Sequence, residues 1–187
     1  SSSILYVFKD AEGNISCEVA AYNKEKFAGY LADGTLLHAV SVSFGMVVND
    51  GKLVKSTELR ESSGDAARSM VGIKADGTLV ICMNDGRGAN NSVGFSSYEE
   101  GEAMLALGCQ WAANCDGGGS STFLSKRVGE ETFTMRSVPC DGAQRPTAHG
   151  IFVASNVAPT GVLDVVNVTA NYDIFAPKTA YTFGAEA

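Results

Sequence analysis

The chain has 187 residues, of which 45% are hydrophobic, 9% aromatic and 19% charged, as expected for a folded domain rather than a disordered segment. Its 21 acidic and 14 basic residues give a formal net charge of −7, which argues against nucleic acid as a partner because phosphate binding needs a positive face. No apolar run approaches the roughly 20 residues of a membrane-spanning helix. The opening residues SSSILYVF lack the features of a signal peptide, so we expect a mature or already cleaved start.

Short apolar and β-branched runs predict a protein built mainly of strands. Turn signals at Asn49–Gly51 and Asp76–Gly77 lie between apolar runs and predict hairpins, which join antiparallel neighbours. We therefore predict an α+β fold with a mixed, largely antiparallel β-sheet and one or a few packed helices. The predicted strands lie in ILYVF, SCEVAAY, AVSVSFGMVV, SMVGI, TLVICMN, TFLSKRV, ETFTMRSV, HGIFVAS and VLDVVNVTA.

One helix is predicted in SSYEEGEAMLALG, from about Ser97 to Leu107. Ser96 and Glu99 have the spacing of a capping box, and Gly108 is a typical stop. The next residues, CQWAANC, predict a buried strand that leads into the stretch NCDGGGSST. Asp116 and the glycines after it should therefore lie at the carboxyl end of a core strand, where ligand-binding groups often converge.

The three glycines of NCDGGGSST allow a linker, a plain turn or an anion-binding cradle of backbone amides. A linker fits poorly between two apolar strands. Three consecutive glycines exceed what a plain turn needs, and Ser120, Ser121 and Thr122 add neutral donors at the same place. Asp116 fits equally well as a general acid or base and as a side chain that stabilises the turn.

Other charged residues occur where strands begin or end. Arg68 and Arg145 precede apolar runs, where an arginine is either a solvated end group or a clamp for phosphate. Asp85 and Arg87 follow a strand within an Asp-Gly turn. Glu99 can be only the partner of Ser96 in the capping box.

The two histidines, His38 and His149, show no metal-ligand spacing and are best explained as partly buried side chains. The five cysteines form no CxxC pair. Cys109 and Cys115, if they share one strand, lie too far apart for a disulfide, whose Cα atoms are within about 7 Å. A bridge between Cys115 and Cys140 stays open, and free buried thiols are the default expectation.

The order of three segments, RSMVGIKADGTLVICMNDGR, VGFSSYEEGEAMLALGCQWAANCDGGGSST and RPTAHGIFV, resembles the phosphodiester glycosidase family. The resemblance runs from about Phe44 to Val153, and its most specific part is the helix followed by Asn-x-Asp-Gly-Gly-Gly-Ser. The family's upstream asparagine before an aromatic pair has no counterpart here, and His149 stands where many members have asparagine. The matching positions are Arg68, Asp85, Arg87, Glu99, Asn114, Asp116, Gly117, Gly118, Gly119, Ser120 and Arg145.

The resemblance implies hydrolysis of the glycosidic bond of a sugar 1-phosphodiester, such as an N-acetylglucosamine 1-phosphodiester, on an extracellular or cell-surface glycan. Asp116 and Glu99 would serve the anomeric carbon or its attacking water. Phosphate would be held by Arg68, Arg145 and the glycine amides. The resemblance implies no required cofactor, and a divalent metal is the alternative that the sequence leaves open. A segment of the parent protein upstream of this chain, or another of its domains, would complete the site.

Two other functions remain open from the sequence. A noncatalytic glycan-binding module or surface scaffold would keep the fold without the full site. A metal-dependent phosphodiesterase would use Asp85 and Asp116 as ligands and cut the P–O bond instead.

After Ser155 the composition changes to Val, Thr and Tyr with none of the candidate residues. We expect residues 1–155 to form the glycosidase-like domain. Residues 156–187 are either a terminal strand pair on the same domain or the start of another β module, and the first is favoured because the chain ends before a second core could form.

Overall fold

The computed structural model describes residues 2–42, 45–55, 64–127, 130–147 and 150–154, with backbone strands at 167–170 and 183–186. By contacts the chain divides into two compact units, Ser1–Ala148 and His149–Ala187. The predicted division into residues 1–155 and 156–187 stays a prediction. None of the described helices is long and apolar enough to span a membrane.

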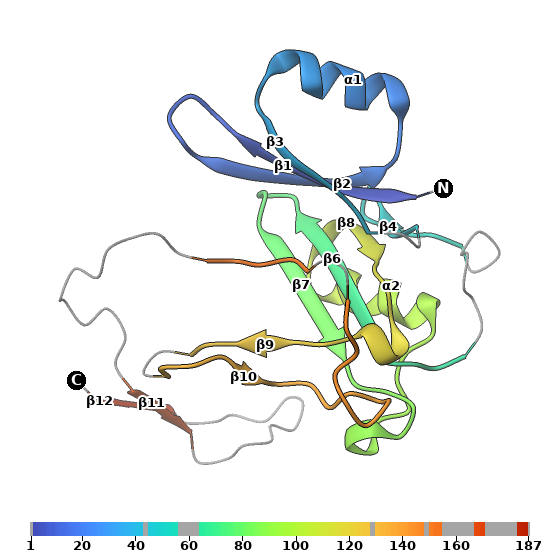
Figure 1. Ribbon diagram of the computed structural model, residues 1–187, viewed down its shortest axis with the longest axis vertical. Helices are drawn as coiled ribbons and strands as arrows, with labels where there is room; N and C mark the ends of the chain where they lie inside the picture. The colour runs from blue at the N-terminus through green and yellow to red at the C-terminus, as the bar shows by residue number, and fades with distance from the viewer. Residues whose placement is uncertain are drawn as a thin grey trace. The chain divides into compact units, whose positions relative to one another are not determined.

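The centre of the first unit is a five-stranded sheet in the order β5-β4-β8-β6-β7, in which every pair is antiparallel (Figure 1). Both predicted hairpins are present: Asp50 and Gly51 join β4 to β5, and Gly77 lies between β6 and β7, all with positive φ. The fold is thus α+β, as predicted. The strands are β4 (Met46–Asn49), β5 (Lys52–Leu53), β6 (Arg68–Lys74), β7 (Leu79–Asn84) and β8 (Cys109–Asn114).

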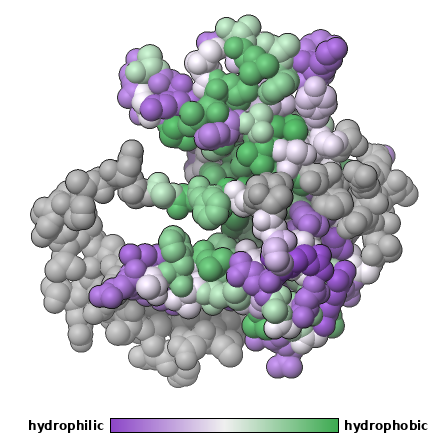
Figure 2. Space-filling view, in the orientation of Figure 1, coloured by the Kyte–Doolittle hydropathy of each residue, from purple (hydrophilic) through white to green (hydrophobic). Residues whose placement is uncertain are grey.

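A second sheet, in the order β2-β1-β3, is formed by β1 (Ser3–Lys9), β2 (Ile15–Ala21) and β3 (Leu36–Ser41). The predicted run AVSVSFGMVV is therefore not one strand, because its two ends belong to β3 and β4 in different sheets. The helix α1 (Lys24–Asp33) was not predicted, although it begins at the N-cap Asn23 and ends at Gly34. Figure 2 shows hydrophobic residues over α1 and this sheet, where Leu31 is 59% exposed.

Both faces of the central sheet are covered by other elements. Successive side chains along a strand point to opposite faces, so the apolar residues of one strand can contact both covering layers. Val71 and Ile73 of β6 pack with Leu5 and Val19 of the second sheet. Met70 lies on the other face and packs in a cluster with Met104 of the helix α2 (Ser97–Ala106). Strands β6 and β8 are thereby fixed between two layers.

Two glycines let α2 lie close to the sheet. A Cβ at Gly72 of β6 would lie 2.7 Å from Met104 Cε and 2.8 Å from Cys109 Sγ. A Cβ at Gly101 of α2 would lie 2.9 Å from the carbonyl oxygen of Val47. At either position, any side chain larger than that of glycine would force a local shift of the neighbouring atoms.

The predicted helix and its capping box are confirmed. Ser96 Oγ accepts from the Glu99 amide at 3.4 Å, and the Glu99 carboxylate accepts from the Ser96 amide and hydroxyl, each at 2.8 Å. The hydrogen bonds from the Ser96 backbone and side chain lower the pKa of Glu99. A lowered pKa means that this stabilisation is present above the ordinary pKa of glutamate and is lost as the pH falls through the lower value in the folded state.

We expect Ser96→Ala to destabilise the chain by about 1 kcal/mol, because it removes the N-cap acceptor. For a chain of this length the melting temperature should fall by roughly 2–4 °C. Circular dichroism melting of the two forms at neutral pH measures this difference. An unchanged melting temperature would show that the cap contributes nothing to the stability of α2.

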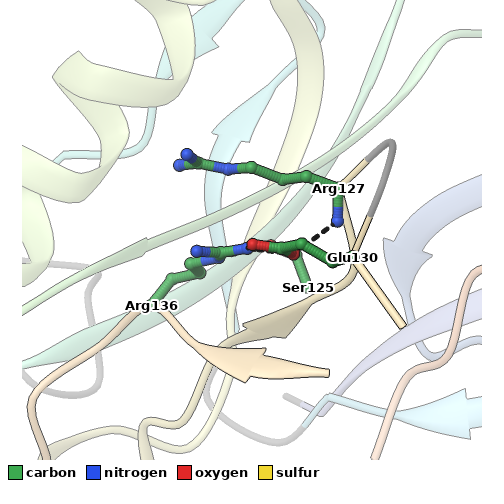
Figure 3. A network of polar contacts seen from close by, with 4 residues as sticks. All are labelled: Ser125, Arg127, Glu130 and Arg136. Carbon is green, nitrogen blue, oxygen red and sulfur yellow. Dashed lines mark hydrogen bonds and ion pairs between the residues drawn. The ribbon is translucent and has the colours of Figure 1, made fainter. Parts of the chain in front are cut away.

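After β8 the chain forms a 3-10 turn, η3 (Gly118–Ser120), and then a hairpin of β9 (Leu124–Ser125) and β10 (Thr134–Met135). These strands are shorter than TFLSKRV and ETFTMRSV predict. Figure 3 shows the polar contacts at the hairpin: the Arg136 side chain donates to Ser125 Oγ and to the Glu130 carboxylate, which also accepts from the Arg127 amide. These polar contacts between side chains thus help to hold a hairpin whose strands share few paired residues.

The second unit contains an antiparallel pair of β11 (Asn167–Ala170) and β12 (Phe183–Glu186). The strand predicted in HGIFVAS is wrong for residues 150–154, which have no strand pairing, and Phe152 is 90% exposed. A short run of apolar residues fits a strand locally, but a strand also needs a neighbour with free backbone groups.

Candidate functional site

The site is formed at one edge of the central sheet, where β6 begins and its two neighbours β7 and β8 end. Strand β6 starts at Arg68, its antiparallel neighbour β8 ends at Asn114, and β7 ends at Asn84, which pairs with Arg68. The residues just beyond these ends therefore meet at one edge. They line a pocket of about 340 Å³, and the lining residues are Gly64, Asp65, Ala66, Arg68, Arg87, Asp116, Gly117 and Gly118.

Five of the predicted site residues line this pocket: Arg68, Arg87, Asp116, Gly117 and Gly118. Their side chains bring two guanidinium groups and one carboxylate to the same hollow. A volume of about 340 Å³ lies near the lower end of the range for small-ligand sites, roughly 300–1,000 Å³. The pocket can therefore hold a small anion with part of the group attached to it.

Arg68 is a buried cation at 4% exposure. Its Nε donates to the carbonyl of Phe95 and its Nη2 to the carbonyl of Gly64, each at 3.0 Å. The same Phe95 forms an antiparallel bridge with Ala66. These bonds fix the guanidinium in one orientation, which favours planar recognition of an anion.

Arg87 reaches the pocket because its neighbours leave room for it. Its own φ is +55°, and Gly118, with a φ of +59°, lies directly beside its guanidinium. A Cβ at Gly118 would lie 2.9 Å from Arg87 Nη1 and 3.1 Å from its Cζ. Any side chain at position 118 would therefore displace this arginine.

Asp116 follows β8 and is exposed, as the sequence places it. Its Oδ1 accepts from the Gly117 amide at 3.0 Å, so one carboxylate oxygen stabilises the turn. Among the described residues no hydrogen bond involves Oδ2. The two sequence interpretations of Asp116 are therefore compatible, because one oxygen holds the turn while the other is available to a ligand.

The three glycines act differently from the expected cradle of amides. The Gly117 amide donates to Asp116, and the Gly118 amide donates to the carbonyl of Ala67 at 2.7 Å. These two amides therefore donate to groups of the protein itself, whereas the sequence predicted that they would donate to a bound anion. Instead, the missing side chains allow close packing: a Cβ at Gly117 would lie 2.9 Å from the Ala67 oxygen. The positive charge of the pocket therefore comes from the arginines.

Gly119, Ser120 and Arg145 lie together beside the pocket but are not among its lining residues. Arg145 Nη1 donates to Ser120 Oγ at 3.4 Å, and its Nη2 forms an ion pair with Asp141. A Cβ at Gly119 would lie 2.0 Å from Asp141 Oδ2 and 2.4 Å from Arg145 Nη2. The third glycine thus gives space to this ion pair, which holds the arginine predicted to bind phosphate.

The carboxylates of Asp85 and Glu99 are engaged in structural bonds. Asp85 Oδ1 accepts from the Val138 amide at 2.9 Å and its Oδ2 from the Asn90 side chain at 3.2 Å. Glu99 closes the capping box of α2. Neither residue lines the pocket. The catalytic role predicted for Glu99 and the substrate contact predicted for Asp85 stay predictions and gain no geometric support.

Asn114 is 2% exposed, and its Oδ1 is buried without a hydrogen-bond partner in the described part of the chain. It does not line the pocket. His149 lies outside the described residues. In those residues, no three His, Cys, Asp or Glu side chains gather as a metal site would require.

All five cysteines are free thiols, including Cys115 and Cys140. Burial raises the pKa of the Cys115 thiol to about 12, with smaller contributions from the Glu100 and Asp116 carboxylates. At neutral pH this thiol is therefore protonated and a poor nucleophile, even though it is next to Asp116.

One pocket residue with a titratable side chain was missed. Asp65 lies in the polar stretch before β6 and contributes a second carboxylate to the lining. No motif or periodicity marks it in the sequence. Only its place three residues before Arg68 is a signal, because that arginine was already a candidate.

The family model for phosphodiester glycosidases matches residues 9–154, which is most of the chain. The chain belongs to the phosphodiester glycosidase family. The match begins well before Phe44 and includes strands β2 and β3 of the second sheet, whereas β1 precedes it except for Lys9. The family description names a glycosidase, which is a hydrolase acting at a glycosidic bond. No curated protein matches the chain.

Two solved structures are similar to the chain to different degrees. The zebrafish N-acetylglucosamine-1-phosphodiester α-N-acetylglucosaminidase catalytic domain, auto-inhibited by its pro-peptide, is 17% identical, with a TM-score of 0.53. That match covers 76% of this chain and 48% of the zebrafish chain, so the chain spans about half the length of this relative. A hypothetical protein from Synechocystis is 16% identical, with a TM-score of 0.42 over 65% of this chain and 29% of the other. The zebrafish likeness supports the family fold.

Proposed function

We propose that this domain binds a sugar 1-phosphodiester in the pocket at the end of β6 and β8 and hydrolyses its glycosidic bond. The observation that carries the proposal is the meeting of Arg68, Arg87 and Asp116 in one pocket of a phosphodiester glycosidase fold. Two cations suit the phosphodiester and its departing phosphate, and a carboxylate suits the cationic anomeric centre.

The charges of the chain favour this division. With a net charge of −7, the protein as a whole repels anions, so a phosphate group needs local cations to bind. Arg68 is fixed by two carbonyls, and Arg87 lies against Gly118. Donors that are already oriented bind the charge that develops on the leaving oxygen without further reorganisation.

The leaving group also reduces what the protein must supply. When the C1–O bond breaks, the electron pair goes to an oxygen of a phosphate monoester, which is stable as an anion at neutral pH. Protonation by a strong general acid is then unnecessary, whereas charge compensation by the arginines is needed. This agrees with a pocket in which the protein's donors are guanidinium groups.

The proposed sugar is N-acetylglucosamine, and the proposed setting is an extracellular or cell-surface glycan. The zebrafish relative, whose name specifies an N-acetylglucosamine 1-phosphodiester, supports the sugar. Because the chain covers 48% of that relative, the proposal includes further parts of the parent protein around the pocket.

The test is incubation of the purified chain, and of its full-length parent, with an N-acetylglucosamine 1-phosphodiester, with and without EDTA. Free sugar produced in both conditions supports the glycosidase. Sugar phosphate that disappears with EDTA would identify a metal-dependent phosphodiesterase instead. Binding without turnover by either form would leave a glycan-binding module, and the hydrolase assignment would be abandoned.

A further inference from the structure

The pocket contains two carboxylates, those of Asp65 and Asp116. They come from different elements: Asp65 precedes β6, and Asp116 follows the neighbouring strand β8. Glycosidases that cut a bond at an anomeric carbon generally use a pair of carboxylates on the two sides of that bond. The resemblance to the family pointed to Asp116 and Glu99 as this pair, but Asp65 lines the pocket with Asp116 and Glu99 does not.

The hydrogen bonds of the nearby acids distinguish between them. Both oxygens of Asp85 and the carboxylate of Glu99 accept bonds that hold loops or the cap of α2. Asp116 uses one oxygen in its turn. Within the part of the chain that the structure describes, no hydrogen bond or ion pair engages the Asp65 side chain. A general base needs an accessible lone pair, which Asp65 has in full.

The backbone around Asp65 is nevertheless fixed. The carbonyl of Gly64 accepts from Arg68 Nη2 at 3.0 Å. On the other side, Ala66 exchanges two backbone hydrogen bonds with Phe95, at 3.0 and 3.2 Å. The residue between these anchors is therefore positioned by the same arginine that is proposed to bind phosphate. The scaffold thus holds the backbone of Asp65 in place while its carboxylate oxygens stay available.

We propose that Asp65 is the general base that removes a proton from the attacking water, an inference that rests on the proposed function. The water oxygen forms a bond to C1 as the C1–O bond to phosphate breaks. The electron pair leaves with the phosphate oxygen beside Arg68 and Arg87, and the proton of the water goes to the Asp65 carboxylate. Asp116 stabilises the positive charge at the anomeric centre. Direct attack of this kind inverts the configuration at C1.

The experiment compares Asp65→Ala and Asp65→Asn with the wild type in steady-state hydrolysis, using whichever form, chain or parent, is active. We expect kcat to fall by about 10²–10⁴-fold in both, with a much smaller change in KM. Azide needs no base to attack C1, so it should restore turnover of Asp65→Ala and give a glycosyl azide. Proton NMR of the sugar first released by the wild type should show the inverted anomer.

The matched control is Asp76→Asn, in the turn at the opposite end of β6, where Asp76 accepts from the Thr78 amide at 2.9 Å. It removes the same charge and should leave kcat and KM unchanged. Undiminished kcat in both Asp65 variants, or a loss that azide does not restore, would overturn the assignment, as would a retained anomer. A wild type that releases no free sugar would instead overturn the proposed function itself, and this inference with it.

Discussion

Asp116→Asn is expected to lower kcat by about 10³-fold, the scale of loss for a group that acts at the reacting centre. Asparagine has nearly the same shape and keeps an oxygen that can accept from the Gly117 amide, so the turn should survive. What it removes is the negative charge facing the pocket. The loss should therefore appear in kcat, because a cationic centre develops in the transition state.

The measurement is the rate of free sugar release at saturating substrate, with thermal melting to verify folding. Asp76→Asn again supplies the comparison, because its side chain also accepts a backbone amide in a turn and its loss of charge is equal. A kcat for Asp116→Asn within about threefold of the wild type would remove this residue from the chemistry, since a group that stabilises charge in the transition state contributes about 10²–10³-fold.

Gly94→Ala is expected to destabilise the protein by about 3 kcal/mol, which combines backbone strain with overpacking. Gly94 has a φ of +102°, and an added Cβ would lie 2.2 Å from the carbonyl oxygen and 2.4 Å from the carbonyl carbon of Ala66. Both contacts are to backbone, so no rotation of a side chain can relieve them. The wall of the pocket from Gly64 to Arg68 would have to move.

The melting temperature should fall by roughly 6–12 °C, taking 2–4 °C for each kcal/mol in a chain of this length. Gly88→Ala is the matched control: its φ is +85°, but no heavy atom lies within 4 Å of the added Cβ. It should cost only the strain of the left-handed conformation, about 1–2 kcal/mol. Equal shifts in the two variants would show that the contact with Ala66 is unimportant.

The same displacement should affect the pocket. Phe95, next to Gly94, accepts from Arg68 Nε and pairs with Ala66. Moving this segment would misplace Arg68 and Asp65 together. We therefore expect the folded fraction of Gly94→Ala to bind an N-acetylglucosamine 1-phosphodiester more weakly than Gly88→Ala does, as titration calorimetry below both melting temperatures would measure. Equal affinities of the two variants would show that the substitution lowers stability without displacing the pocket residues.

Features encoded in a few neighbouring residues could be predicted from the sequence. The capping box of Ser96 and Glu99, the helix that it begins and the two hairpin turns depend on hydrogen bonds or φ values within four residues. The position of Asp116 at the end of a buried strand followed from the same local reasoning. Arg68 and Arg87 were candidates because they stand at the ends of predicted strands, and the resemblance to the family matched both positions.

Features that depend on pairing partners could not be predicted in this way. The segment Gly150–Ala154 has the composition of a strand but no strand pairing, and the run from Ala39 to Val48 is shared between two sheets. Helix α1 was overlooked despite its cap because most of its residues are exposed and its apolar stripe is short.

The strand-rich α+β class, the helix before the glycine stretch and the arginines and acids near strand ends follow from the order of the amino acids alone. Which of these residues meet depends on how the strands pair. The antiparallel register of β6 with β7 and β8 brings residues 64–68, 87 and 116–118 to one edge, while Glu99 and Asp85 are engaged in loop and helix contacts. The physical reason is that backbone pairing fixes which strand ends lie side by side, and no local pattern encodes that choice.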